Sequence, residues 1–244
     1  MILKLIVALI LFAMPYTLPF SWKFFVLTPL FLMVGAKIFG VKFAVNFNLK
    51  AIIFFVAISL ALFIASSFAI NNAVSKAGLQ TIQNGSLLWV ISPVFQSLHE
   101  EFAIRSLLLK CANKIGPLVS AVLLANIFAL THYVLYGFGF EKVQLDFSVL
   151  VTLFSFGLGA NLLFLEGQNL FLPYLFHVCW NLARFRNLLL RDGEILKEGV
   201  TFNLIEGSTP VLTLSICFLV FGLLFYFRNK SRIPAGVALL ENTN

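Results

Sequence analysis

Long apolar runs separated by short polar links dominate this chain. A window of about 19 residues divides it into about eight hydrophobic segments. They are residues 3–20, 24–39, 51–70, 86–109, 116–136, 147–165, 170–190 and 209–227. Because a membrane-spanning helix needs about 20 consecutive apolar residues, the pattern predicts an all-α polytopic membrane bundle of about eight transmembrane helices.

The links between these segments predict one integral membrane domain over residues 1–244. Its core covers about residues 86–190, followed by a charged loop at 191–208 and a short polar tail at 228–244. Residues 71–85 are the most polar stretch of the first half and have room for a short interfacial helix. The sequence shows no internal repeat and no second domain.

Composition supports lipid as the solvent of this chain. Hydrophobic residues make up 60% of it and charged residues 11%, whereas a soluble domain needs a more polar surface. The net charge of +7 comes from Lys and Arg scattered singly between apolar runs, a pattern that fits membrane loops and anionic headgroups. We therefore expect no nucleic-acid partner. The three cysteines have no metal-type spacing and predict no disulfide framework.

The arrangement of basic residues also suggests an orientation. An even number of spans places both termini on the same side of the membrane. The cluster Arg228, Lys230 and Arg232 after the last span favours cytoplasmic termini, because cytoplasmic loops are enriched in Lys and Arg. The short chain, without long eukaryotic-type extensions, favours a bacterial plasma membrane.

The segment 86–109 is unusual because it carries two adjacent glutamates and an arginine, and charges at membrane depth are costly. Glu101 and Arg105 are four residues apart, so they share a helix face and can form an ion pair that locks helices together. Glu100 is rotated by about 100° from Glu101. With no helix-neighbour cation of its own, Glu100 must be neutral, hydrated or paired across helices, and such a carboxylate can act as a general base.

All three histidines, His99, His132 and His177, lie in predicted spans. A single buried histidine is usually a hydrogen-bonded core residue, but the placement of every histidine at membrane depth favours a function. Asn181 lies one turn after His177, so the imidazole and the amide can donate hydrogen bonds to one oxygen. Depths measured along straight helices do not place these groups in one plane. Their convergence requires tilt, a bend near Pro173 or a buried turn.

Three motifs occur in order, each on its own predicted span. They are Glu-Glu-x-x-x-Arg at residues 100–105, Phe-x-x-x-His at 128–132 and His-x-x-x-Asn at 177–181. Over about residues 88–182 the sequence resembles the CPBP (Abi, CAAX-protease and bacteriocin-processing) family of intramembrane glutamic-type endopeptidases. Family members often have an aromatic residue before the motif arginine and a glycine after it, where this chain has Ile104 and Ser106.

The resemblance implies a membrane-embedded endopeptidase that cuts a membrane-associated protein or peptide. Glu100 and His132 would activate a water molecule that attacks the scissile carbonyl. His177 and Asn181 would stabilise the oxyanion.

The resemblance also implies a role for Glu101 and Arg105 and a reaction that needs no metal ion. Glu101 and Arg105 would hold the site together. The family is described as using glutamate without metal, so no cofactor is favoured, although a zinc ion at Glu100, His132 and His177 is a possible alternative.

Three other functions are compatible with parts of the pattern. A transporter or proton-coupled channel also uses intramembrane Glu, His and Arg, but it predicts pseudo-symmetric halves with broken helices, which this sequence does not show. A haem protein with His132 and His177 as axial ligands leaves Glu100 and Asn181 without a role. A non-catalytic membrane scaffold of the same fold stays open until activity is measured.

Overall fold

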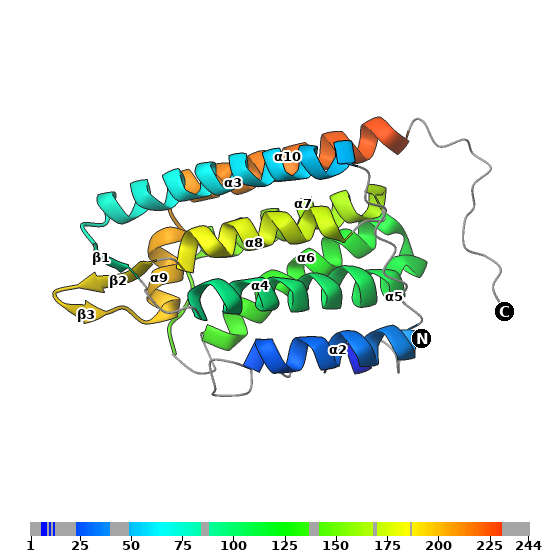
Figure 1. Ribbon diagram of the computed structural model, residues 1–244, viewed down its shortest axis with the longest axis horizontal. Coiled ribbons are helices and arrows are strands. Elements are labelled where there is room, and N and C mark those ends of the chain that lie inside the picture. Colours follow the sequence, from blue (N-terminus) through cyan, green and yellow to red (C-terminus); the bar gives the residue numbers. More distant parts are fainter. Residues whose placement is uncertain are drawn as a thin grey trace.

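The computed structural model describes residues 6–8, 10, 12, 23–39, 49–83, 88–136, 142–167, 170–185 and 187–230. It is a bundle of long helices with a small sheet at one end (Figure 1). The longer helices are α2 (Lys23–Phe39), α3 (Leu49–Lys76), α4 (Leu88–Glu101), α6 (Pro117–Val134), α7 (Phe147–Gly167), α8 (Phe171–Phe185) and α10 (Thr209–Lys230). The shorter ones are the π-helix η2 (Phe102–Leu109), α5 (Lys110–Ala112), the 3₁₀ turn η3 (Asn113–Ile115) and α9 (Glu198–Ile205).

Several of these helices have the length and composition of membrane spans. Among the described residues, four stretches qualify, and they are Val56–Lys76, Pro117–Val134, Phe147–Glu166 and Thr209–Arg228. Large apolar side chains on the outer surface, such as Phe68 and Leu224, are more than 60% exposed, which is favourable in lipid but not in water. The predicted all-α membrane bundle is confirmed. The first predicted span, 3–20, lies mostly outside the described residues.

The polar stretch predicted at residues 71–85 does not form a separate interfacial helix. Its first part continues α3 to Lys76, and strand β1 (Gln80–Gln83) follows after a turn. Membrane helices often extend beyond the apolar core into the interface, so hydropathy underestimates their length.

Strand β2 (Asn187–Arg191) replaces the end of the predicted seventh span, which was expected to reach residue 190. β2 pairs antiparallel with β1 on one side and with β3 (Glu194–Ile195) on the other. Short apolar runs do not distinguish a strand from a helix by hydrophobicity alone. The stretch 191–208, predicted as a charged loop, also contains β3 and the helix α9.

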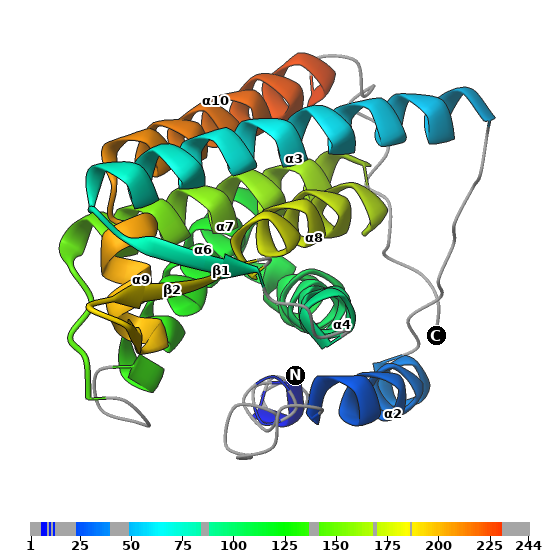
Figure 2. The ribbon, with the colours of Figure 1, turned by 60° about the vertical axis from the view of Figure 1, so that its left-hand side comes forward.

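The helix formed by α4 and η2 runs through the middle of the bundle. It contacts α2 on one side and α8 on the other, while α7 packs between α6 and α10 (Figure 2). All eight residues of η2 are buried. π-Helical turns are rare and occur frequently at functional sites, and this one begins directly after Glu101.

Helices α7 and α10 approach each other closely at two glycines. A Cβ atom on Gly222 would lie 2.8 Å from the carbonyl oxygen of Gly159. A Cβ atom on Gly159 would lie 2.8 Å from a ring carbon of Phe218. Small residues at such crossings allow the backbones of membrane helices to pack directly.

We therefore expect Gly222→Ala to force α7 and α10 apart and to lower the free energy of unfolding by about 1–3 kcal/mol. Thermal unfolding of the purified protein in detergent measures this loss. Leu224→Ala is the control, because Leu224 is 67% exposed on the same helix and its truncation should leave stability almost unchanged. Equal stability of Gly222→Ala and wild type would contradict the close packing.

Candidate active site

A cavity of about 40 Å³ lies inside the bundle. A water molecule needs about 10–15 Å³ of such space, so the cavity has room for solvent. Its wall includes Gln96, Glu100, His132, His177, Asn181 and Arg184, together with several aromatic rings. The four residues predicted to be catalytic thus come from α4, α6 and α8 and line one cavity.

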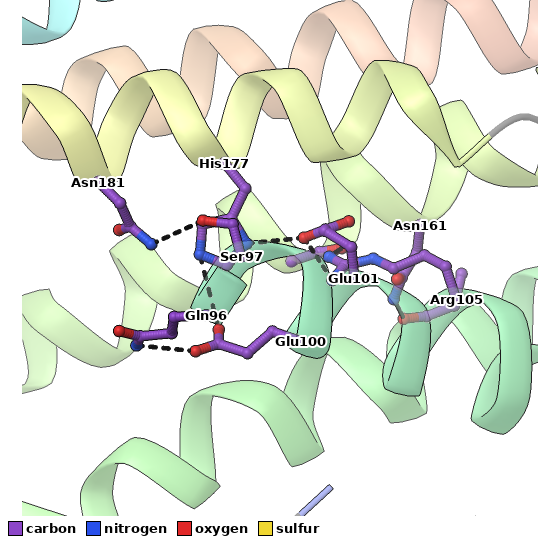
Figure 3. A network of polar contacts seen from close by, with 10 residues as sticks. Gln96, Ser97, Glu100, Glu101, Arg105, Asn161, His177 and Asn181 are labelled. Atoms are coloured by element: carbon purple, nitrogen blue, oxygen red, sulfur yellow. Dashed lines mark hydrogen bonds and ion pairs between the residues drawn. The ribbon is translucent and has the colours of Figure 1, made fainter. Parts of the chain in front are cut away.

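Glu101 lies at the centre of a buried polar network next to this cavity (Figure 3). Arg105 donates through Nη1 to Glu101 Oε1 at 2.9 Å, and His177 Nδ1 lies 2.8 Å from the same oxygen. Arg105 also donates through Nη2 to the carbonyl of Gly157 at 3.3 Å. Glu101 and Arg105 are fully buried, and their network joins α4 and η2 to α7 and α8.

This network orients the imidazole of His177. An ionised carboxylate only accepts hydrogen bonds, so Nδ1 of His177 carries a proton that it donates to Glu101. Nε2 therefore points to the other side of the ring, where Glu100 Oε2 lies 3.6 Å away. That distance is longer than a hydrogen bond, so the two groups are neighbours along the cavity wall.

Glu100 is held on its other side by its own helix. Gln96, one turn earlier on α4, donates through Nε2 to Glu100 Oε1 at 2.9 Å. Sequence reasoning did not identify Gln96, although its spacing of four residues from Glu100 was the available signal. One carboxylate oxygen of Glu100 is thus bound by an amide, and the other faces His177.

Asn181 is oriented by a second residue that the sequence analysis missed. Its Nδ2 donates to the hydroxyl of Ser97 at 3.0 Å, and Ser97 is fully buried on α4. An amide nitrogen carries two hydrogens. The hydrogen bond to Ser97 therefore uses one of these hydrogens and holds the Asn181 amide in place, while the amide still lines the cavity.

The Phe-x-x-x-His motif places an aromatic ring between the two cavity histidines. The Phe128 ring lies 4.7 Å from the His132 ring and 6.2 Å from the His177 ring, measured between centroids. His132 Nδ1 lies 2.9 Å from the carbonyl oxygen of Phe128. Because that carbonyl is an acceptor, Nδ1 carries the hydrogen, and Nε2 lies on the opposite edge of the ring.

His99 does not line the cavity. Its Nε2 lies 3.2 Å from the carbonyl oxygen of Phe12, and its ring contacts the rings of Phe12, Phe24 and Phe31. It joins α4 to helices earlier in the chain. Of the three intramembrane histidines, two line the cavity and His99 belongs to the packing.

Part of the chain resembles a known protein family. Residues 82–183 match the family model for the Rce1-like type II CAAX prenyl endopeptidases. We refer to residues 82–183 as the Rce1-like segment. The Rce1-like segment contains all three motifs, so the resemblance found in the sequence is confirmed. At family level, the match supports a CAAX-type intramembrane protease. No curated protein matches the chain.

The zinc alternative concerns Glu100, His132 and His177, which all line the cavity. Within the described part of the chain, no group of three His, Cys, Asp or Glu residues is placed to hold a metal ion. His177 directs Nδ1 to Glu101, and Glu100 directs one oxygen to Gln96.

The Glu101–Arg105 pair should be essential to the stability of the Rce1-like segment. Arg105→Met leaves the carboxylate of Glu101 without its cation, and we expect a loss of about 3–5 kcal/mol in the free energy of unfolding. The double variant Glu101→Gln/Arg105→Met has no uncompensated charge and should recover much of this loss. Denaturant unfolding in detergent compares the two, and a double variant as unstable as the single one would contradict the ion-pair interpretation.

Proposed function

We propose that the cavity is the active site of an intramembrane endopeptidase that hydrolyses a peptide bond of a membrane-associated protein or peptide. The observation that carries the proposal is that a carboxylate, two imidazoles and an amide from three helices line one cavity large enough for water. The Rce1-like match of residues 82–183 supports the same reaction class.

In the first step Glu100 and His132 take a proton from a water molecule in the cavity. The water oxygen bonds to the carbonyl carbon of the substrate, and the π electrons of the carbonyl move to its oxygen. Glu100 suits this role because Gln96 fixes one of its oxygens. A positioned base of this kind contributes about 10²–10⁴-fold to a rate.

In the second step His177 and Asn181 stabilise the oxyanion. Asn181 donates from Nδ2. His177 donates from Nε2, which requires a ring protonated on both nitrogens because Nδ1 donates to Glu101. Donors held in place before the reaction stabilise developing charge more strongly than mobile water does.

Collapse of the oxyanion completes the reaction. The carbonyl forms again as the C–N bond breaks, and the leaving nitrogen takes the proton that Glu100 and His132 removed from water. The products are one new carboxyl terminus and one new amine terminus, so atoms and charge balance.

The surroundings of the cavity support a substrate with an apolar group near the cut. A second, largely apolar cavity of about 370 Å³ shares Phe156, Trp180 and Ser215 with the catalytic one. Its other walls come mainly from α3, α8 and α10. The matched family is described by its action on CAAX prenyl proteins, and a prenyl chain is an apolar group of this kind.

The proposed setting is a bacterial plasma membrane with cytoplasmic termini. The end of α10 and the sheet lie at opposite ends of the bundle (Figure 1). Cytoplasmic termini would therefore place β1, β2, β3 and α9 on the outer side of the membrane.

The roles of Glu100 and His132 are tested by cleavage of a library of membrane-anchored peptides in nanodiscs. We expect Glu100→Gln and His132→Asn each to lower kcat by at least about 100-fold, because each removes a proton acceptor. His99→Asn is the matched control. It changes a histidine outside the cavity and should retain cleavage per folded molecule. Glu100→Gln protein that is folded and cuts as well as wild type would disprove the assignment.

Chelation tests the proposal that no metal takes part. Cleavage should be unchanged after treatment with EDTA, because the proposed mechanism uses Glu100 as the base and gives no step to a metal ion. The measurement is the initial rate before and after dialysis against the chelator. Loss of cleavage that zinc restores would overturn the metal-free proposal.

A further inference from the structure

Arg184 and Glu206 form a second buried ion pair in the wall of the catalytic cavity. Arg184 Nε lies 2.6 Å from Glu206 Oε1, and the two side chains are only 3% and 1% exposed. Neither residue belongs to the three motifs, and both lie outside the matched segment 82–183. The mechanism above makes no use of them.

The guanidinium of Arg184 is held from two sides. The ring of Phe202, on α9, lies 4.2 Å from Arg184 Cζ. Glu206 follows α9, and its backbone carbonyl accepts a hydrogen bond from the hydroxyl of Thr152 on α7 at 2.8 Å. A long and otherwise mobile side chain is thereby fixed before any substrate arrives.

Arg184 continues the line of groups that the proposed mechanism uses. His177, Asn181 and Arg184 are spaced so that they share one face of α8, and all three line the cavity. At 1.5 Å per residue, Arg184 lies about 10 Å along the helix from His177. An extended peptide covers about 3.3 Å per residue, so this distance corresponds to about three residues of substrate.

Arg184 is the group in this wall that can bind an anion, and it lies beside the carboxylates of Glu100 and Glu206. Among the described residues that line the cavity, Arg184 is the sole Lys or Arg. A guanidinium has five N–H donors in a planar fork, so it can bind more than one carboxylate. Buried ion pairs are seldom better for stability than apolar packing, so stability alone does not account for this pair in the cavity wall. Binding of a substrate carboxylate would account for it.

We propose that Arg184, positioned by Glu206 and Phe202, binds a carboxylate of the substrate within about three residues of the scissile bond. This proposal rests on the proposed peptidase function and names a specificity-determining residue for it. The carboxylate belongs to the substrate's C-terminus or to an Asp or Glu side chain near it, and the experiment separates these sources.

The experiment uses the full chain in nanodiscs and three peptides with the same membrane anchor and cut site. One ends in a free carboxylate, one in an amide, and one in an amide with a glutamate near the end. For wild type we expect kcat/KM to favour a carboxylate peptide over the plain amide by about 10- to 100-fold. A preference for the peptide with the free carboxylate assigns the contact to the substrate's C-terminus. A preference for the peptide with the glutamate assigns it to an acidic side chain.

Variants assign the preference to Arg184. Arg184→Gln/Glu206→Gln removes both charges without leaving one buried alone, and it should bring the ratio close to one. Glu206→Gln keeps the guanidinium and an acceptor oxygen that can still position it. This variant should preserve the ratio, so it tests the proposal even if the double variant does not fold. Arg191→Gln, which changes an exposed arginine on β2, is the matched control and should keep the wild-type ratio.

Three results would overturn the inference. They are a wild-type ratio near one, a ratio that survives in the double variant, and a ratio that disappears in Glu206→Gln. Binding of the same peptides to Glu100→Gln protein separates this inference from the proposed function. Carboxylate-selective binding by an inactive Glu100→Gln protein supports both proposals, whereas normal cleavage by that variant contradicts only the assignment of Glu100 as the base.

Discussion

The carboxylate of Glu101 receives two partners from different parts of the bundle, Arg105 from the following π-helix and His177 from α8. In the apolar interior of a membrane protein, a charge must be paired or hydrated, so these three side chains constrain how α4 and α8 can pack. The same contacts determine which edge of the His177 imidazole faces the cavity. The positions of Glu100 and Asn181 depend on this arrangement, because they lie on the same two helices.

The two adjacent glutamates have different surroundings because successive residues of a helix point about 100° apart. Both are buried, but Glu101 faces Arg105, whereas Glu100 faces the cavity and Gln96. The side-chain amide of Gln96 orients Glu100, and the hydroxyl of Ser97 orients Asn181. The neutral partners fix geometry without adding charge to the site, which suits a cavity in which a carboxylate is proposed to act as a base.

Much of this arrangement was predictable from the sequence because it depends on local helix geometry. The Glu101–Arg105 pair follows from a spacing of four residues, and the shared face of His177 and Asn181 follows from the same rule. Convergence of the groups in depth did not follow, because straight α-helices would place them in different planes, whereas the helix becomes a π-helix directly after Glu101. The role of His99 was also not predictable, since only tertiary contacts show which side of α4 faces the cavity. The sheet, α9 and Arg184 with Glu206 depend on pairing between distant segments, which hydropathy does not report.

In the proposed reaction, water in this cavity attacks the substrate carbonyl directly, with Glu100 acting as base. A single turnover with a membrane-anchored peptide in water enriched in ¹⁸O tests this step, with mass spectrometry of both the product and the peptide that contains Glu100. Direct attack by water predicts one ¹⁸O atom in the new carboxyl terminus, none in Glu100, and no labelled product from the Glu100→Gln protein. Label in the Glu100 carboxylate, or labelled product formed equally well by Glu100→Gln, would contradict it.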